Sequence, residues 1–206
     1  MLAKTHIVAG VGAAVVVAVL LHHPVTPSIV LLGGMGGLAP DLDHPQALLT
    51  RHLMGIRTMS GLARRTGLVH HRGIAHSLVA LIVTTGILLP LLRHVVAHLI
   101  WAGGLALGHP AWVLGLWHLW GTGAMIGWGA GYASHMVADI FNTKGVQWFW
   151  PFNVWVHLPL PNITVGTWPE TVFRWGIIGG ILLWNPWLGV ITASAGELIY
   201  RGVKSA

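Results

Sequence analysis

Long apolar runs separated by short polar stretches dominate the chain. A membrane-spanning helix needs about 20 mainly apolar residues, and a helix pairs its backbone polar groups internally, as a bilayer requires. The pattern predicts an all-α integral membrane bundle of about five transmembrane helices, forming a single domain over residues 1–206. The five predicted spans lie at about 6–21, 25–39, 75–93, 111–138 and 172–198.

The short runs and the stretches between the spans allow further predictions. The first two runs are short, so we expect them to form a tight hairpin around His22–Pro27 or to lie partly inside the protein. The glycine-containing stretch 94–110 is open between a helix extension and an interfacial turn, and residues 140–171 are expected to form a structured segment at the interface. No small-residue cleavage pattern follows Leu21, which favours a retained first helix over a signal peptide.

Composition supports a membrane environment. Charged residues make up only 8% of the chain, whereas soluble domains carry about 25%. The twelve tryptophans suit the headgroup region, where their rings are buried and their N–H groups stay hydrated. The chain has no cysteine, so any metal must be bound by His, Asp or Glu.

The positive charges are unevenly divided between the two ends of the predicted spans. Following the spans along the chain places most Lys and Arg residues on the side where the first run begins, and only Arg93, Arg201 and Lys204 on the other. The positive-inside rule assigns the richer side to the cytoplasm. Topology therefore accounts for the net charge of +6, and no nucleic-acid binding is expected.

Two carboxylates and a histidine follow the second apolar run, in the sequence Pro40-Asp41-Leu42-Asp43-His44. Pro40 disfavours a continuing helix, so these side chains are presented where the run leaves the membrane. Carboxylate oxygens and an imidazole nitrogen together bind divalent cations. A helix-end turn capped by an Asp is the alternative interpretation.

A second motif, His70-His71-Arg72-Gly73-Ile74-Ala75-His76-Ser77, precedes the third run. Exposed N–H groups at a helix start favour anions, and the forked guanidinium of Arg72 matches phosphate oxygens. A basic flank that stops membrane transfer would explain Arg72, but it would not explain the histidines.

A third motif pairs His135 with Asp139, four residues apart and therefore on one face of a helix. A local His–Asp hydrogen bond is the alternative. His6, at the start of the first run, is a single histidine and is weak evidence alone. Span parity, however, places it on the same membrane face as the three motifs. Together they predict a site for one to three metal ions, with these candidate ligands: His6, Asp41, Asp43, His44, His71, His76, His135 and Asp139.

The histidines toward the opposite face are interpreted as interfacial or packing residues. They are His22, His23, His94, His98, His109 and His118. His52 and His157 stay open.

The four motifs together resemble the predicted membrane-bound metal-dependent hydrolases, some bacterial members of which are inner-membrane proteins controlled by the LexA repressor. The motifs cover residues 5–6, 40–44, 71–77 and 135–139. That family is distantly similar to zinc-dependent phospholipase C and single-strand nucleases, which are helical and bind a zinc cluster. The resemblance implies a prokaryotic inner-membrane location and these leading ligands: His6, Asp41, His76, His135 and Asp139.

The chain departs from this family's pattern at two points. Ala75 stands where the family usually has Thr, which removes a hydroxyl but no ligand. The soluble enzymes also have a further histidine–acid ligand pair, for which the chain offers only His157 with Glu170.

The leading hypothesis is a metal-dependent hydrolase that cleaves an ester or phosphoester of a lipid at the cytoplasmic face. Zinc is the expected ion, with manganese or iron as alternatives. Arg72 would bind phosphate oxygens and Asp43 would act as general base, with His71 beside them. The alternatives are a metal ion transporter or metal-handling membrane protein, haem binding by paired histidines on the spans, and a purely structural membrane protein.

Overall fold

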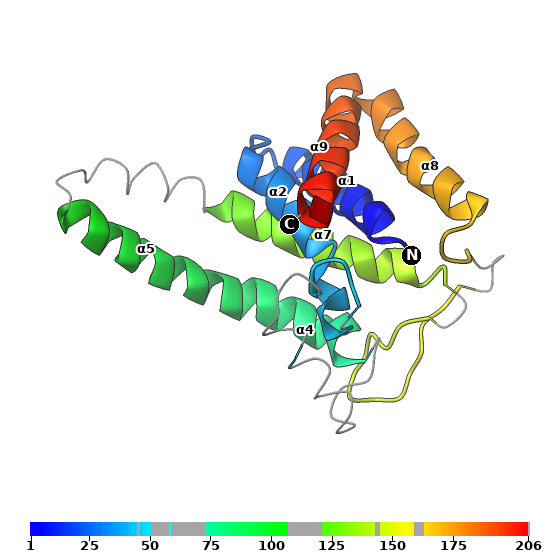
Figure 1. Cartoon of the computed structure of the whole chain (residues 1–206), viewed down its shortest axis with the longest axis horizontal. Coiled ribbons are helices and arrows are strands. Elements are labelled where there is room, and N and C mark those ends of the chain that lie inside the picture. The colour runs from blue at the N-terminus through cyan, green and yellow to red at the C-terminus, as the bar shows by residue number, and fades with distance from the viewer. Residues whose placement is uncertain are drawn as a thin grey trace.

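Helices dominate the architecture of this computed structural model, which describes residues 1–44, 46–50, 58, 73–106, 121–142, 145–158 and 163–205 (Figure 1). The all-helical prediction is confirmed: the described residues contain no strand, only an isolated bridge between Val146 and Val156. In chain order the helices are α1 (Ala3–Leu20), α2 (Pro27–Gly36), the 3-10 turns η1 (Ala39–Asp43) and η3 (Ile74–His76), α4 (Leu78–Val83), the π-helix η4 (Thr84–Leu88), α5 (Leu89–Ala106), α7 (Thr122–Asp139), α8 (Trp168–Trp184) and α9 (Pro186–Ser205).

Glycines let α1, α2 and α7 pack backbone against backbone, and these three helices form the centre of the molecule. A Cβ added to Gly33 of α2 would lie 2.6 Å from the Cβ of Ala14 in α1. A Cβ on Gly127 of α7 would lie 2.6 Å from the carbonyl oxygen of Ile29 in α2. Such close approach is typical of helices in membranes, where small residues replace the hydrophobic effect as the basis of packing.

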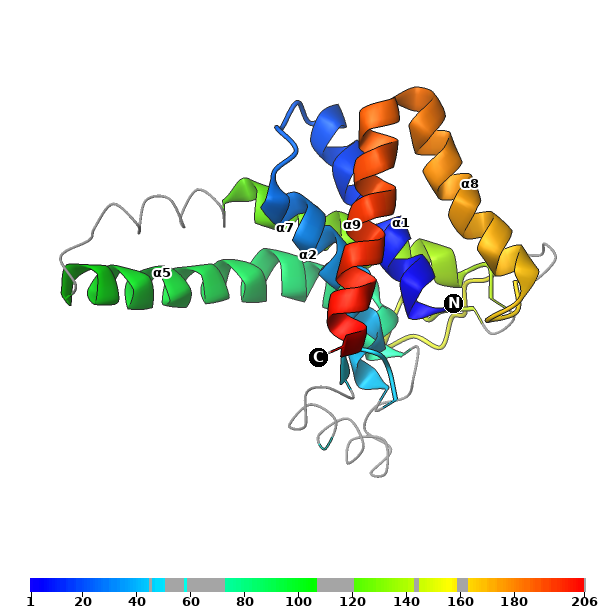
Figure 2. The ribbon, with the colours of Figure 1, turned by 45° about the horizontal axis from the view of Figure 1, so that its top comes forward.

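Leu78–Ala106, composed of α4, η4 and α5, runs as one long helical rod that projects from the centre (Figures 1 and 2). The residues 94–106 therefore extend this helix, which decides one alternative left open by the sequence. Apolar side chains along the rod are exposed, among them Ile82 and Leu99. A continuous exposed apolar surface of this kind is expected against lipid rather than water.

The predicted span 172–198 is wrong, because the chain breaks there into α8 and α9. Asn185 is extended, with φ −152° and ψ 106°. Pro186 causes the break: it disfavours a helical conformation in the residue before it, and it begins the next helix, where its missing N–H is tolerated. Exposed apolar side chains, including Leu183 and Trp187, surround this corner.

Two helical segments, Ala3–Leu20 and Leu78–Leu99, are long and apolar enough to cross a membrane among the residues that the structure describes. The predicted hairpin is present, since α1 packs on α2 across the turn at residues 21–26. With 10 residues, however, α2 is only about 15 Å long and cannot span alone. The number of five spans therefore stays a prediction.

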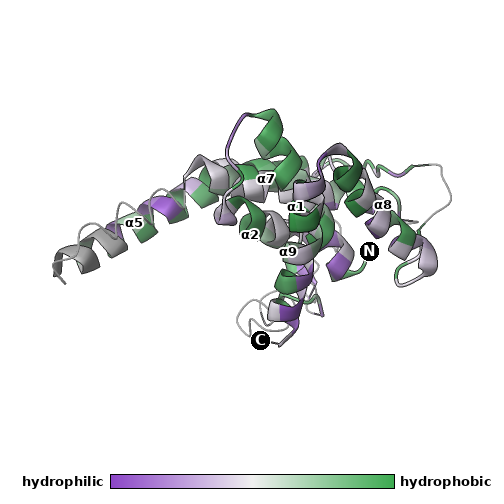
Figure 3. Ribbon diagram, turned by 90° about the horizontal axis from the view of Figure 1, so that it is seen from above, coloured by the Kyte–Doolittle hydropathy of each residue, from purple (hydrophilic) through white to green (hydrophobic). Residues whose placement is uncertain are grey.

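Residues 145–158 fold into a structured loop beside the end of α7. Val146 and Val156 exchange backbone hydrogen bonds of 3.0 and 2.9 Å, and the N–H of Leu158 donates to the carbonyl of Ile140. The central helices are largely hydrophobic, whereas the C-terminal end of α9 carries hydrophilic residues (Figure 3). The start of α1, the turns η1 and η3, and the end of α7 meet at one end of the bundle, and the candidate site lies there.

Candidate metal site

Four separate elements supply the side chains of the candidate site. His6 lies in the second turn of α1, and η1 carries Asp41 directly after α2. His135 and Asp139 lie on one face of the last turns of α7. All these elements except η3 are held by the glycine-packed centre.

The fourth element is the turn η3, which brings His76 to the site. The Tyr132 hydroxyl of α7 donates a hydrogen bond to the carbonyl of Ala75, next to His76. Ser77 then caps α4, since its Oγ accepts from the N–H of Ala80 at 3.1 Å. These contacts place His76 where the rod begins, against the end of α7.

Two histidine nitrogens form the centre of the cluster. Nε2 of His76 and Nε2 of His135 lie 3.2 Å apart. Oδ1 of Asp41 lies 3.7 Å from each of them, and Oδ2 of Asp139 lies 3.9 Å from each. Two nitrogens and two carboxylate oxygens therefore converge on one small volume.

The tautomer of His135 follows from its second ring nitrogen. Nδ1 lies 2.7 Å from the carbonyl oxygen of Gly37, which can only accept, so Nδ1 carries the hydrogen and donates it. In the neutral ring the lone pair of Nε2 is then directed at the cluster. A backbone carbonyl holding the far nitrogen of a histidine in this way is typical of metal-ligating histidines.

His76 has a corresponding partner in Asp43. Oδ2 of the buried Asp43 lies 3.8 Å from Nδ1 of His76, whereas Nε2 of the same ring faces Asp41, His135 and Asp139. A carboxylate behind a ligating imidazole fixes the ring orientation and raises its basicity. This placement favours an orienting role for Asp43 over a place among the converging ligand atoms.

Each of the two carboxylates, taken with the two central nitrogens, gives a set of distances that fits one divalent ion. Zinc binds histidine nitrogen and carboxylate oxygen at about 2.0–2.2 Å, so two ligand atoms of one ion lie no more than about 4.4 Å apart. The separations of 3.2 to 3.9 Å around His76 and His135 all satisfy this limit. Two imidazoles with two carboxylates form a ligand set suited to zinc, manganese or iron.

His6 adds to the cluster beside the opposite oxygen of Asp139. Its Nε2 lies 3.5 Å from Oδ1 of Asp139, and its ring stacks on that of His135 with centroids 3.7 Å apart. His6, Asp41 and His135 offer ligand atoms within 4.8 Å of one another, as do His76, His135 and Asp139. The two sets share His135.

The residues of the cluster differ in their access to solvent. The His76 and His135 side chains are 0% exposed and Asp139 is 2% exposed, whereas Asp41 is 24% exposed. Burial alone would raise the pKa of the Asp41 carboxyl, but the neighbouring His135 and His76 outweigh it and hold the pKa well below its usual range. Asp41 is therefore a charged residue at which the buried cluster reaches the protein surface.

Three other predicted residues are not placed in this cluster. Nδ1 of the half-buried His44 accepts a hydrogen bond of 3.3 Å from the N–H of Gln46. His71 and Arg72 lie outside the described residues, so their predicted roles stay predictions.

The possible pair of His157 and Glu170 has another arrangement. The buried Glu170 accepts hydrogen bonds from the N–H groups of Leu2 and Gly166, which ties the start of α1 to the start of α8. His157 is exposed. Glu170 therefore acts as a structural carboxylate.

Sequence reasoning missed three partners of the cluster. The amide of Asn142 donates a hydrogen bond of 2.6 Å to Oδ1 of Asp139, and its spacing of three residues from Asp139 was an available signal. The carbonyl of Gly37 has no signal in the sequence, because every residue has a carbonyl and only the fold selects this one. The nitrogen of Met1 also lies 3.3 Å from Oδ1 of Asp139.

The histidines predicted to lie away from the site do so where they are described. His22 lies in the turn between α1 and α2, and His94 and His98 are exposed on α5 with rings stacked 6.1 Å apart. His109, His118 and His52 lie outside the described residues.

The fold and the cluster define an α-helical membrane protein with a buried histidine–aspartate centre at one end of its bundle. The family model described as YdjM inner membrane protein matches residues 1–204, and the chain belongs to this family. Its location in the inner membrane, predicted from the sequence, agrees with that membership. No curated protein and no solved structure matches the chain.

Proposed function

We propose that this inner-membrane protein is a metal-dependent hydrolase that cleaves an ester or phosphoester bond of a lipid at the cytoplasmic face. The observation that supports this most directly is the pair of histidine nitrogens 3.2 Å apart, with a carboxylate oxygen of Asp41 and one of Asp139 within 3.9 Å of both. Three separate elements, η1, η3 and α7, converge to make this group, and the far ring nitrogen of each central histidine faces an oxygen atom, from Asp43 or from the carbonyl of Gly37.

His76, His135, Asp41 and Asp139 would hold the first ion, and His6 with the second oxygen of Asp139 would contribute to another. A divalent ion in such a site supplies Lewis-acid activation of water and of a phosphoryl or carbonyl oxygen. The protein residues fix the number and direction of the ligands. Asp43 and the carbonyl of Gly37 keep the two central rings in place.

The position of the cluster suits a lipid substrate. Its residues lie at helix ends rather than in the middle of a span, and a scissile bond near a lipid headgroup would lie at the same depth. Arg72 stays our candidate for binding phosphate oxygens, by the chemistry of its guanidinium.

Hydrolysis by the detergent-purified protein tests this function. We expect turnover of short-chain lipid esters or phosphoesters that is abolished by chelation and restored by zinc or manganese. His76→Ala and Asp139→Ala should lose turnover by at least about 1000-fold, since each removes a ligand. His98→Ala, an exposed histidine on α5, is the matched control and should keep full turnover. Full activity in either ligand variant would overturn the proposal.

A further inference from the structure

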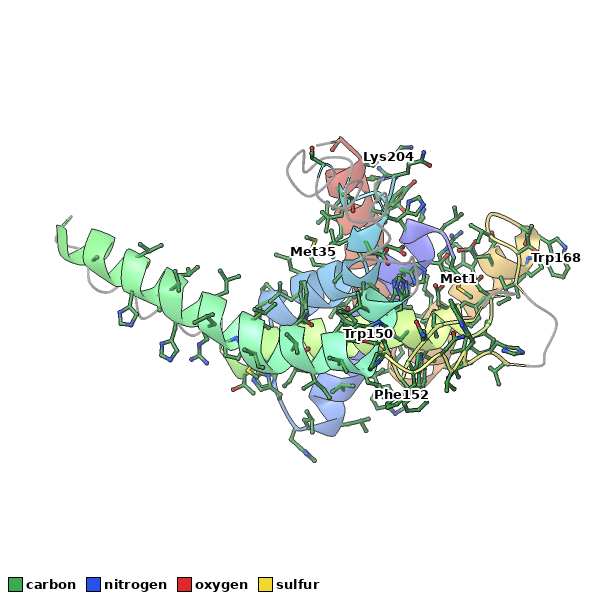
Figure 4. All side chains as sticks on the ribbon, turned by 90° about the horizontal axis from the view of Figure 1, so that it is seen from below. Met1, Met35, Trp150, Phe152, Trp168 and Lys204 are labelled. Carbon is green, nitrogen blue, oxygen red and sulfur yellow. The ribbon has the colours of Figure 1, made fainter. Side chains whose placement is uncertain are left out.

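A cleft of about 350 Å³ opens beside the cluster, between the start of α1, the segment after η1, α8 and α9. Among the residues that line it are Leu2, Lys4, Asp41, Leu48, Arg174 and Tyr200. A volume of this size suits a small organic ligand. Figure 4 shows this end of the molecule from below, with Met1 near the start of α1 and Lys204 at the end of α9.

The cleft reaches the cluster through Asp41. Asp41 both lines the cleft and lies 3.7 Å from the central nitrogens of His76 and His135. It is also the partly exposed member of an otherwise buried group, with 24% of its side chain accessible. A ligand in the cleft would therefore lie next to the candidate metal site.

Arg174 is a cation of this cleft without a carboxylate partner among the described residues. Lys4, another cation of the wall, is already paired with Glu197 at 2.5 Å, and the nitrogen of Met1 lies 3.3 Å from Asp139. Arg174 lies on α8, half-buried, and its guanidinium has no hydrogen bond within the described part of the chain. A guanidinium beside a cleft favours an anion, and its fork matches the oxygens of a phosphate group.

The remaining wall is suited to the apolar part of a lipid. Leu2, Ala3, Ala47 and Leu48 line the same cleft as Arg174. Tyr200 completes it with an aromatic ring that has the ammonium of Lys4 5.5 Å from its centroid. A cation on one side and apolar side chains on the other recognise an amphiphile with an anionic head.

We propose that this cleft is the substrate-binding site and that Arg174 binds the phosphate group of a lipid phosphoester. This contact would determine specificity. It narrows the substrate of the function proposed above from esters in general to phosphoesters. The cleft would hold the phosphate between Arg174 and the cluster, with the apolar wall against the glycerol and the first acyl carbons. This inference rests on the proposed hydrolase function for its meaning, but the binding that it predicts does not need turnover.

Binding of dihexanoyl phosphatidic acid to the full-length protein in detergent tests the inference, by calorimetry with chelated and with zinc-loaded protein. We expect Arg174→Gln to weaken binding by at least about tenfold in both forms, because a charge-assisted contact is lost. Arg174→Lys should recover part of the affinity, since it keeps the charge but not the fork. Arg201→Gln is the matched control, because Arg201 is exposed and already paired with Glu197.

Further ligands show whether the cleft recognises a lipid phosphate or phosphate alone. They also test the cleft proposal separately from the hydrolase proposal. Dihexanoylglycerol, which lacks the phosphate, should bind at least about tenfold more weakly than dihexanoyl phosphatidic acid. Inorganic phosphate that binds as tightly as the lipid would overturn the lipid assignment. Wild-type affinity in Arg174→Gln would overturn the cleft as the phosphate site. Binding that depends on Arg174 in a protein that never takes up metal would support the cleft while refuting the hydrolase.

Discussion

At the scale of single residues, the second ring nitrogens of His76 and His135 determine what the cluster can do. Each imidazole directs Nε2 at the centre, and each has an oxygen atom on its Nδ1 side, from Asp43 and from the carbonyl of Gly37. The motif around residue 41 predicted that both carboxylates bind metal. The fold assigns them different positions, because η1 turns Asp41 toward the two Nε2 atoms and Asp43 toward the back of His76.

Asp43→Asn tests the orienting role. Loss of a carboxylate behind a ligating histidine weakens metal binding by about 10–100-fold, and we expect that loss of zinc affinity for this variant in a competition titration. Metal stoichiometry at saturating zinc should be unchanged, because no ligand is removed. Glu197→Gln, an exposed carboxylate outside the cluster, serves as the control. A loss of stoichiometry in Asp43→Asn would show that Asp43 is itself a ligand.

At the scale of elements, the sequence could predict helices but not how closely they approach. The apolar runs predicted the positions of α1, α2 and α7. Pro40 predicted that the helix does not continue into Asp41 and Asp43, which lie in η1. The division of 172–198 into two helices was missed because hydropathy continues through the break at Asn185. The span pattern also placed the four motifs at helix ends, which is why the cluster could be anticipated without knowledge of contacts.

Gly131→Ala tests the packing that holds the site together. A Cβ at Gly131 would collide with the backbone of Gly33, which cannot move without displacing α2 from α7. We expect a destabilisation of about 1–3 kcal/mol and reduced zinc affinity, measured by chemical unfolding in detergent and by metal titration. Gly179→Ala on α8, where a Cβ meets nothing within 4 Å, should be neutral or stabilise by up to about 1 kcal/mol. Equal stability of the two variants would contradict this account.

At the scale of the whole molecule, the site lies at one end of the bundle. The turn between α1 and α2 lies away from it, because the site is at the start of α1 and the turn follows the end of α1. The break at Asn185 returns the chain toward the site, so Lys204 lies beside Tyr200 and near Lys4 rather than on the opposite side, where the span pattern had placed Arg201 and Lys204. The positive-inside rule still predicts that the site end, which gains these charges, faces the cytoplasm. The number of membrane crossings could not be read from hydropathy alone, because an apolar run such as that of α2 can be buried by neighbouring helices instead of by lipid.

The absence of cysteine allows a direct test of this orientation. We expect a single cysteine at Gln46, an exposed residue near the site, to react with a membrane-impermeant maleimide only after intact cells are permeabilised. A single cysteine at Pro24, exposed in the turn between α1 and α2, should react in intact cells once the outer membrane is passed. The reverse labelling pattern would invert the topology.

Metal content tests the central claim most directly. Elemental mass spectrometry of the purified protein should find at least about one zinc, manganese or iron ion per chain, lost in His76→Ala and Asp139→Ala and kept in His98→Ala. Such a result would establish that the two central histidines and their carboxylates bind metal. A wild-type protein that takes up no metal even after reconstitution would leave the cluster as a set of buried hydrogen bonds and would contradict the account.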